Sequence, residues 1–502
     1  MTDTVLAEAA IDHRLVARIA AALTLQPDSE AVEFDGDSVT WGELATVAGR
    51  IASIGREHGG PAPQVGIVLR NSPVHVAAFL GVLLAGGCVV VINPARGDVR
   101  NRADVDDLEM SVIVGTAEDL ATNVDAQRCT TVTVEDMTTD PSVRSVSSQG
   151  DHVSGAQRPD VAVHMLTSGT TGPPKRVALT YDMLAHSVIG PTDTAPPSRL
   201  SSGVAIVNAP LVHIGGVFRI LQCIVAARRF MLLPRFELTT WADAVRRHRP
   251  RAVSLVPTAL RMVLHSDLTR DDLASIKAVT SGTAPLSAAD ADAFTEKFGI
   301  PVLTSYAATE FGGGVAGWTL ADHREFWMSK RGSVGRAQPG SQLRVVDDDG
   351  TALGPDQTGL LEVKPGQLGA AATWIRTTDI ARIDDDGFLW ILGRADQAII
   401  RGGFKIIPED VRTALESHPA VEGACVVGRS DPRLGETPVA MVEPRPGQVV
   451  TVDDLIAHLS GRVARYEIPT AIQIVDAIPR TPSGKADLSA VRVRLDGGDT
   501  HA

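Results

Sequence analysis

The sequence predicts an α/β protein with largely parallel sheets, and three observations support this fold class. Apolar, strand-like runs alternate with helical patterns along most of the chain, which is typical of parallel strands joined by helices. From about residue 340 the pattern changes to short strands separated by acidic turns. The last hundred residues alternate strands and helices again, so we expect a domain boundary near residues 393–396.

Local signals specify the first elements. Thr40 can cap a helix that begins at Trp41, and Glu43 completes a capping box. The apolar stretch 76–92 contains three glycines and changes from Leu- and Ala-rich to Val-rich. It predicts a buried helix, a glycine stop and a buried strand rather than a membrane span. Strands are predicted over 66–69, 88–92, 111–114, 204–207, 229–233 and 252–256.

The later segments are predicted from their turn chemistry. Residues 139–160 are rich in Ser, Asp, Gly and Pro and indicate an exposed loop. The sequence DDDG occurs at 347–350 and again at 384–387. Neither copy is followed by the further ligands of a calcium loop, so both are interpreted as hairpin turns. Residues 496–502 are interpreted as a polar tail.

Composition excludes several classes of protein. The 502 residues suggest about three domain-sized units, with 44% hydrophobic and 21% charged residues. A net charge of −13 argues against a nucleic-acid binder or a polybasic membrane anchor. The four cysteines are scattered and form no CxxC motif, which argues against a metal cluster and against a disulfide framework. This cysteine usage fits a reducing compartment. With no signal-peptide pattern at the start, we expect a cytoplasmic protein without a transmembrane segment.

The strongest local motif is TSGTTGPPK, residues 167–175, which follows the apolar strand 161–166. Glycines let backbone N–H groups turn toward an anion, while hydroxyls and a lysine add donors and charge. The motif therefore predicts a phosphate-binding loop, although it lacks the Gly-Lys-Ser/Thr of a Walker A loop. The alternative is a polar surface loop. Only seven of the 47 basic residues are lysines, which makes Lys175 more informative than an arginine at this position.

This loop resembles the signature loop of the adenylate-forming superfamily, which comprises acyl-CoA synthetases, peptide-synthetase adenylation domains and luciferases. Further segments match the superfamily in order: PLVHIGG (210–216), TSGTAPL (280–286), SYAATEFGG (305–313), GSVGRAQPG (332–340), WIRTTD (374–379), GRADQAIIRGGFKI (393–406) and PRTPSGK (479–485). The resemblance is nearest to acyl-CoA synthetases. It implies a large N-terminal domain, 1–392, of stacked αβ sheets plus a β-barrel-like part. A hinge at 393–396 and a small mobile α+β domain, 397–502, complete the implied fold.

The resemblance also implies an ATP site. Its phosphate grip would be Thr167, Ser168, Gly169, Thr170, Thr171, Gly172 and Lys175, and the remaining ATP-binding residues would be Gly282, Thr283, Ala284, Tyr306, Asp379 and Arg394. Tyr306 would stack on adenine, although a buried core tyrosine is the alternative. Asp379 and Arg394 would read the ribose hydroxyls. Glu310 would bind Mg²⁺, a hard cation that prefers carboxylate and phosphate oxygen, and Thr309 would contact the α-phosphate.

The catalytic residues implied by the resemblance are Lys485, Thr309, Glu310 and His213. Lys485 follows Pro482 and Gly484 in a segment that can bring its ammonium to the carboxylate and the α-phosphate, although a solvated lysine is the alternative. Asp396 matches the hinge position, and Gly402 and Gly403 match the loop that lines the CoA tunnel. The expected acyl pocket comprises His213, Ile214, Gly215, Ala307, Phe311, Gly312 and Gly313. A satisfied core histidine is the alternative for His213.

The predicted function is ATP-dependent ligation of a carboxylic acid, fatty or aryl, to CoA, with release of AMP and pyrophosphate. An acyl carrier protein as acceptor, or a non-catalytic nucleotide-binding relative, are the alternatives. The second is motivated by departures from the family pattern at Ala307, Thr378 and Arg176, and by a shortened segment over 363–373. The GxGxxG match at 312–317 does not open a helix after a strand, so a dinucleotide site there is not expected.

Overall fold

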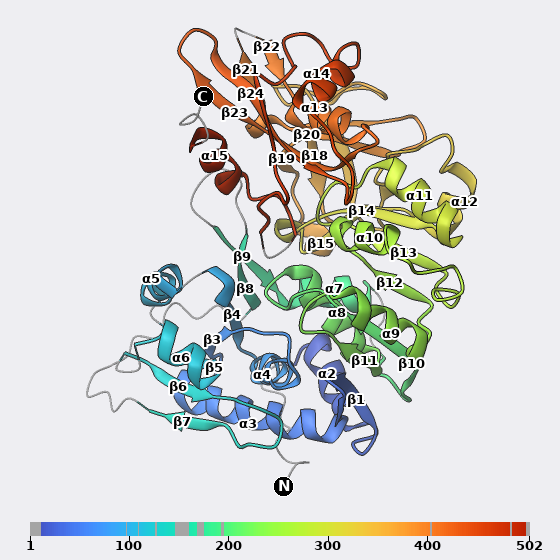
Figure 1. Ribbon diagram of the computed structural model, residues 1–502. Coiled ribbons are helices and arrows are strands. Elements are labelled where there is room, and N and C mark those ends of the chain that lie inside the picture. The colour runs from blue at the N-terminus through green and yellow to red at the C-terminus, as the bar shows by residue number, and fades with distance from the viewer. Residues whose placement is uncertain are drawn as a thin grey trace.

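The structure is a computed structural model that describes residues 12–96, 98–108, 110–125, 128–145, 160–167, 175–191, 195–401, 404–481 and 484–497. Figure 1 shows the blue N-terminal elements at the bottom and the orange and red C-terminal elements at the top, with the yellow and green elements between them. Five sheets organise these elements. Each hydrophobic core cluster of the described residues lies wholly before residue 392 or wholly after residue 398, and the boundary at 393–396 stays a prediction.

The largest sheet has seven strands in the order β7-β6-β5-β3-β4-β8-β9 and is parallel except at its two edges. The predicted helix, glycine stop and strand over 76–92 are confirmed, as are the strands at 66–69, 88–92 and 111–114. A short exposed strand interrupts the segment predicted as a loop over 139–160. The elements are α3 (Trp41–Gly59), β3 (Gln64–Val68), α4 (Pro73–Leu84), β4 (Cys88–Ile92), η1 (Pro94–Arg96), α5 (Asp98–Leu108), β5 (Val112–Gly115), α6 (Ala117–Asn123), β6 (Thr130–Thr133), β7 (Ser142–Arg144), β8 (Val161–Thr167) and β9 (Lys175–Thr180).

A second sheet, in the order β10-β11-β1-β2, shares its hydrophobic core with the first. Thr40 and Glu43 form the predicted capping box at the start of α3. The strands predicted at 204–207 and 229–233 are confirmed. The elements are α2 (Arg14–Thr24), β1 (Glu30–Phe34), β2 (Asp37–Thr40), α7 (Tyr181–Ile189), β10 (Ser201–Val207), α8 (Ile214–Val225) and β11 (Arg228–Leu232).

The third sheet, β12-β13-β14-β15-β16, begins parallel and becomes antiparallel after β14. Its predicted first strand is present, although it ends at Ser254 rather than at residue 256. The elements are α9 (Leu238–His248), β12 (Ala252–Ser254), α10 (Pro257–Leu264), β13 (Ala278–Ser281), α11 (Ala288–Phe298), β14 (Val302–Ala308), η2 (Thr309–Phe311), β15 (Gly313–Gly317), α12 (Leu320–Phe326) and β16 (Arg336–Ala337).

The predicted change of pattern near residue 340 is confirmed by a four-stranded antiparallel sheet, which is the counterpart of the expected barrel-like part. Both DDDG segments are turns: Asp347 N donates to Thr351 O at 3.0 Å, and Asp384 N donates to Phe388 O at 3.1 Å. The elements are β17 (Gln342–Val346), β18 (Gly359–Lys364), η3 (Gly366–Ala371), β19 (Ile375–Ile383) and β20 (Leu389–Arg394).

The C-terminal region has its own sheet, β22-β21-β24-β23, with β25 added beside β24. Helix α15 extends into the segment predicted as a polar tail. All four cysteines are buried, and none of them forms a disulfide in the described residues. None of the helices in the described ranges has the length and apolar character needed to cross a membrane. The elements are η4 (Ala395–Gln397), β21 (Ile399–Arg401), β22 (Phe404–Ile406), α13 (Pro408–Glu416), β23 (Val421–Asp431), β24 (Gly435–Pro444), α14 (Val452–Leu459), β25 (Ala471–Ile474) and α15 (Leu488–Gly497).

Candidate functional site

The predicted phosphate-binding loop connects two antiparallel strands, β8 and β9. Thr167 at the end of β8 lies opposite Lys175 at the start of β9. Strand β9, which follows the loop, lies against η2, and η2 contains Thr309 and Glu310. The middle of the loop lies outside the described residues: Ser168, Gly169, Thr170, Thr171 and Gly172.

Tyr306 and Asp379 lie together at the junction of the third and fourth sheets. The Tyr306 hydroxyl donates a hydrogen bond to Asp379 Oδ2. Burial raises the pKa of the Tyr306 hydroxyl, and the negative charge of Asp379 adds to this effect. Burial also raises the pKa of the Asp379 carboxyl above its usual range, although Tyr306 and Arg394 oppose the shift. The pair is therefore a hydrogen bond in a partly desolvated environment. A ribose hydroxyl can compete with the Tyr306 hydroxyl as a donor to the Asp379 carboxylate.

Arg394 lies opposite Asp379 on the neighbouring strand and points its guanidinium toward the predicted hinge residue. Arg394 Nε donates to Asp396 Oδ1 at 2.9 Å, and Nη2 donates to Asp396 Oδ2 at 2.7 Å. A further bond from Nη2 reaches Thr378 Oγ1 at 2.6 Å. The hydrogen bonds with Asp396 raise the pKa of Arg394. In this arrangement the predicted ribose-reading arginine and the predicted hinge are in direct contact.

Lys485 belongs to a tight turn that contacts the large domain. Thr481 N donates to Lys485 O at 2.7 Å and Gly484 N donates to Thr481 O at 2.8 Å, so the turn is held by its own backbone. Thr258 at the start of α10 donates through Oγ1 to Gly484 O at 3.3 Å. Sequence analysis did not single out Thr258, because only this long-range contact gives it a role at the site.

The side chain of Lys485 is exposed to solvent, yet the surrounding protein affects its charge. Burial of part of the group and the nearby Arg394 lower the pKa of the Lys485 ammonium, whereas Glu310 and Asp379 act in the opposite direction. The predicted catalytic lysine is thus brought together with the predicted metal ligand and both predicted ribose-reading residues. Glu310 itself is exposed, so its carboxylate is open to a ligand.

His213 precedes the first residue of α8 and faces the same place. Burial lowers the pKa of its imidazole to about 4, and the positive charge of Lys485 adds to this effect. Its Nε2 is buried and has no hydrogen-bond partner among the described residues. The unused Nε2 argues against the alternative of a satisfied core histidine, while the role of His213 stays a prediction. A neutral imidazole with an unused ring nitrogen is suited to receive a ligand.

The predicted adenine-binding segment follows β13. Gly282, Thr283 and Ala284 connect this strand to the segment before α11, and Thr283 has a φ of 72°. A non-glycine residue in the left-handed region is uncommon and is found where the surroundings enforce it. The backbone of this segment is therefore held in a specific conformation near the carboxyl end of β13.

The predicted acyl-pocket residues come from α8 and from the end of β14. A side chain at Gly313 would meet the Phe218 ring at 3.0 Å, and the carbonyl of Gly312 accepts a hydrogen bond from Ser187 at 2.9 Å. A side chain at Gly215 would meet nothing within 4 Å, so there is open space beside the start of α8. Ile214 is partly buried against the first core, and Ala307 is exposed beside Gly314 of β15. Phe311 differs from the others because it is 2% exposed and packs in the core with β17–β20.

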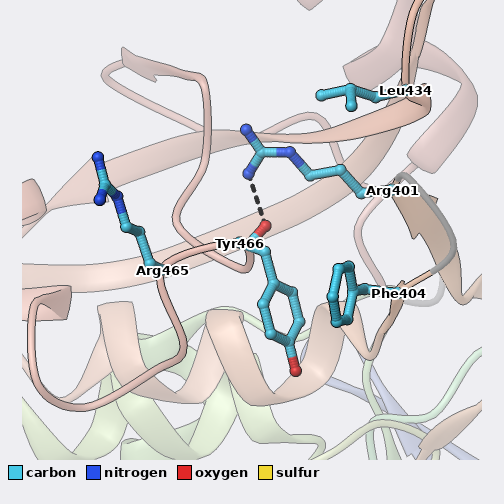
Figure 2. A pocket seen from close by; sticks show the side chains of 5 residues that line it. All are labelled: Arg401, Phe404, Leu434, Arg465 and Tyr466. Carbon is cyan, nitrogen blue, oxygen red and sulfur yellow. Dashed lines mark hydrogen bonds between the residues drawn. The ribbon is translucent and has the colours of Figure 1, made fainter.

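A cavity of about 400 Å³ lies beside the predicted CoA-tunnel residues, which themselves lie outside the described residues: Gly402 and Gly403. Figure 2 shows the Phe404 and Tyr466 rings facing each other, with Arg401 above them and Arg465 to one side. The ring centroids are 4.6 Å apart and the planes differ by 20°. Arg401 Nη1 donates to Tyr466 O at 2.6 Å. Sequence analysis did not find this site, because Arg401 and Tyr466 are 65 positions apart.

Metal-ligating residues are few at the site. The described residues contain no group of three or more His, Cys, Asp or Glu side chains arranged to hold a metal ion. Glu310 is a single exposed carboxylate near β9. This arrangement does not suit a cation bound by protein alone, but it suits Mg²⁺ that shares its oxygen ligands between one carboxylate and bound phosphates.

Comparisons with known proteins agree with this geometry. The family model described as "AMP-binding enzyme" matches residues 19–369, and "AMP-binding enzyme C-terminal domain" matches residues 410–485. The chain is 31% identical over 490 residues to 4-coumarate–CoA ligase 3 of Oryza sativa subsp. japonica, covering 92% of this chain and 88% of that protein. It is 29% identical over 497 residues to indoleacetate–CoA ligase of Aromatoleum aromaticum, covering 93% and 95%.

Solved structures share the fold. ATP-bound MatB from Rhodopseudomonas palustris superposes with a TM-score of 0.80 at 24% identity, covering 95% of this chain and 99% of that chain. O-succinylbenzoate coenzyme A synthetase from Bacillus subtilis, in complex with ATP and magnesium ion, gives a TM-score of 0.76 at 25% identity, covering 96% and 99%. With two family models matching in order and relatives aligned over nine-tenths of its length, the chain belongs to the AMP-binding enzymes of the adenylate-forming superfamily.

Proposed function

We propose that this protein is an ATP- and Mg²⁺-dependent carboxylate–CoA ligase that acts on an aryl acid. One observation carries the proposal: the turn that contains Lys485 of the small domain contacts Thr258 of the large domain, and Glu310, Asp379 and the hinge residue Arg394 influence the pKa of the Lys485 ammonium. Positive and negative side chains from both parts of the chain therefore lie near Lys485. His213 is close enough for Lys485 to affect its pKa, and its Nε2 has no hydrogen-bond partner among the described residues. Such an arrangement suits phosphoryl chemistry, where the protein supplies cations and donors rather than a nucleophile.

In the first half-reaction an oxygen of the substrate carboxylate attacks the α-phosphorus of ATP. The bond to the β-phosphate oxygen breaks, and pyrophosphate leaves with that electron pair. Negative charge increases on the phosphoryl oxygens, and the Lys485 ammonium is placed to stabilise it. Lys175 at the end of the phosphate loop and Arg394 at the ribose side add positive charge. Mg²⁺ held by Glu310 would neutralise phosphate charge when it is bound with ATP.

In the second half-reaction the thiol of CoA attacks the acyl carbonyl, the thiol loses its proton, and AMP leaves. The small domain would turn about Asp396 so that the segment containing Gly402 and Gly403 faces the adenylate. The cavity beside that segment combines arginines with two aromatic rings, of which Phe404 is 57% and Tyr466 36% exposed. Arginines suit phosphate groups and exposed rings suit a base, so the cavity is a candidate site for the nucleotide part of CoA.

The shape of the acyl pocket favours a compact aryl acid over a long fatty acid. Phe218 approaches Gly313 and supplies a flat apolar wall, while the space beside Gly215 is open. The curated relatives described above are named for 4-coumarate and indoleacetate, which are both aryl acids. These observations support an aromatic ring in the pocket, with the carboxylate toward His213 and Lys485.

A panel of aryl and fatty acids, assayed for pyrophosphate release with and without CoA, tests the proposal. We expect pyrophosphate and a CoA thioester from aryl acids, with fatty acids of ten or more carbons at least about tenfold poorer in kcat/KM. Pyrophosphate release without any CoA thioester would contradict the ligase assignment. In that case transfer to a phosphopantetheinylated carrier protein would identify the carrier as the acceptor.

A further inference from the structure

Helix α8 has one face in the core and another face toward the predicted acyl pocket. Its buried residues are Gly216, Val217, Ile220, Leu221, Cys223, Ile224 and Val225. Positions three, four and seven after Gly215 lie on one side of a helix, so Gly215, Phe218, Arg219 and Gln222 form one stripe, of which Phe218 also packs against the first core. Gly215 borders open space and Phe218 approaches Gly313. Arg219 therefore lies on the pocket side of α8, one residue beyond the aromatic wall.

Arg219 connects α8 to the third sheet. Its Nη2 donates to Thr280 Oγ1 at 2.9 Å, two residues before Gly282 on the strand that leads to the predicted adenine segment. Its Nη1 donates to Gln222 Oε1 at 3.3 Å. The guanidinium thus bridges the helix and the carboxyl end of β13, six positions along the chain from His213.

The charge of Arg219 has no acidic partner among the described residues. Most other buried or half-buried arginines of the molecule pair with a carboxylate, as Arg261 does with Asp290 and Arg176 with Asp104. Burial lowers the pKa of Arg219, and only Cys223 acts in the opposite direction. A guanidinium stays protonated in proteins and has five N–H donors, of which the two hydrogen bonds above use two. A partly desolvated cation with unused donors faces a pocket for a carboxylic acid.

We propose that Arg219 binds a second carboxylate on the acid, so that the substrate is a dicarboxylic aryl acid whose distal carboxylate pairs with the guanidinium. This inference rests on the proposed ligase function and narrows its substrate class. Arg219 lies six positions after His213, which corresponds to about 9 Å along the helix axis. An aromatic ring with one carboxylate on a short side chain and another at the far ring position spans this interval. The fork of an arginine matches a carboxylate bidentately.

Three acids that differ only at the far ring position provide the test: 4-carboxycinnamate, its uncharged isostere 4-nitrocinnamate, and cinnamate. For the unmodified protein we expect kcat/KM for 4-carboxycinnamate to exceed that for the other two acids by about 100-fold or more. The reason is that an acid without the second carboxylate leaves the buried N–H donors of Arg219 without a partner, which weakens its binding in the transition state. Arg219→Leu should remove this preference, lowering kcat/KM for 4-carboxycinnamate about 100-fold while cinnamate changes less than about threefold.

Two further variants separate recognition from folding. Arg219→Lys keeps the charge without the fork and should retain an intermediate preference, whereas a structural role for Arg219 would reduce turnover of all three acids together. Arg228→Leu removes an arginine that donates to Ser202 O at 2.7 Å, away from Thr280, and it should leave the preference unchanged. Equal losses on all acids for Arg219→Leu, or a preference of the unmodified protein for the uncharged isosteres, would overturn the inference and leave the ligase function intact. Absence of pyrophosphate release with every acid would instead overturn the ligase function.

Discussion

Replacing Lys485 with alanine is the sharpest perturbation that the structure offers. The turn that carries Lys485 is held by backbone groups of Thr481 and Gly484 and by the hydroxyl of Thr258, and none of these bonds uses the lysine side chain. The substitution therefore removes an ammonium while the turn and its contact with α10 remain. The expected effect is confined to the charge that Lys485 brings to Glu310, Asp379 and Arg394.

The magnitude follows from the chemistry at that place. A positioned cation that meets charge developing on phosphoryl oxygens contributes about 3–4 kcal/mol, which is about a 10²–10³-fold effect on rate. We expect Lys485→Ala to lower the rate of adenylation by this factor. The affinity for ATP should change less than about threefold, because Lys175, Arg394 and the adenine-binding segment remain in place.

The assay is acid-dependent pyrophosphate release under single-turnover conditions, with ATP affinity measured separately by calorimetry. Lys277→Ala is the matched control, because Lys277 is an exposed lysine outside the site and its loss should leave adenylation unchanged. A second measurement supplies the acyl-adenylate directly and follows thioester formation, which should be little affected. Adenylation by Lys485→Ala within fivefold of the unmodified protein would refute the catalytic assignment.

Three further predictions follow from local geometry. Gly216→Ala places a methyl group against the backbone oxygen of Pro210 and should lower the free energy of unfolding, measured by calorimetry, by about 1–3 kcal/mol. Gly215→Ala, which has open space for the methyl group, should not destabilise the protein. Burial lowers the pKa of His213 from 6.5 to about 4 in the folded protein, so the unfolded chain takes up the proton first as the pH falls. The free energy of unfolding should therefore decrease between pH 6.5 and pH 4 by at most about 3 kcal/mol. His213→Gln should remove this contribution from denaturation curves measured at acidic pH. Arg261→Gln removes a 3.6 Å ion pair between α10 and Glu416 of the small domain. It should weaken the docking of the small domain onto the large domain by about 1 kcal/mol, measured as a lower docked fraction by fluorescence energy transfer. An unchanged docked fraction would contradict this role.

The parts of the fold that depend on local chemistry could be predicted from the sequence. The capping box at Thr40 is satisfied within four residues, and the acidic turns at 347–350 and 384–387 close on themselves. The strand at 139–160 was missed because β7 is three residues long and gains its bonds from β6 rather than from its own pattern. Such a strand has no periodicity that a sequence can display.

The candidate site divides in the same way. Motif resemblance indicated Tyr306, Asp379 and Lys485, and the structure brings them together, while their roles stay predictions. Arg219 and Thr258 were not indicated, because each gains its significance from a partner far away in the sequence. An arginine on an amphipathic helix gives no sequence signal of whether a carboxylate will face it. The structure shows that Arg219 bonds to Thr280 of β13 and that it has no carboxylate partner in the described part of the chain.

The hydrogen bond between Thr258 and Gly484 joins residues 226 positions apart, and this separation has a consequence for the order of folding. Contacts of long sequence separation form late, since the entropy of closing the intervening chain must be lost before they stabilise the protein. Domains of a growing chain generally fold from the N-terminus as units. The large domain can thus acquire its nucleotide-binding surface before Lys485 has been synthesised, so that a nascent chain would hold ATP without consuming it until the last segment docks.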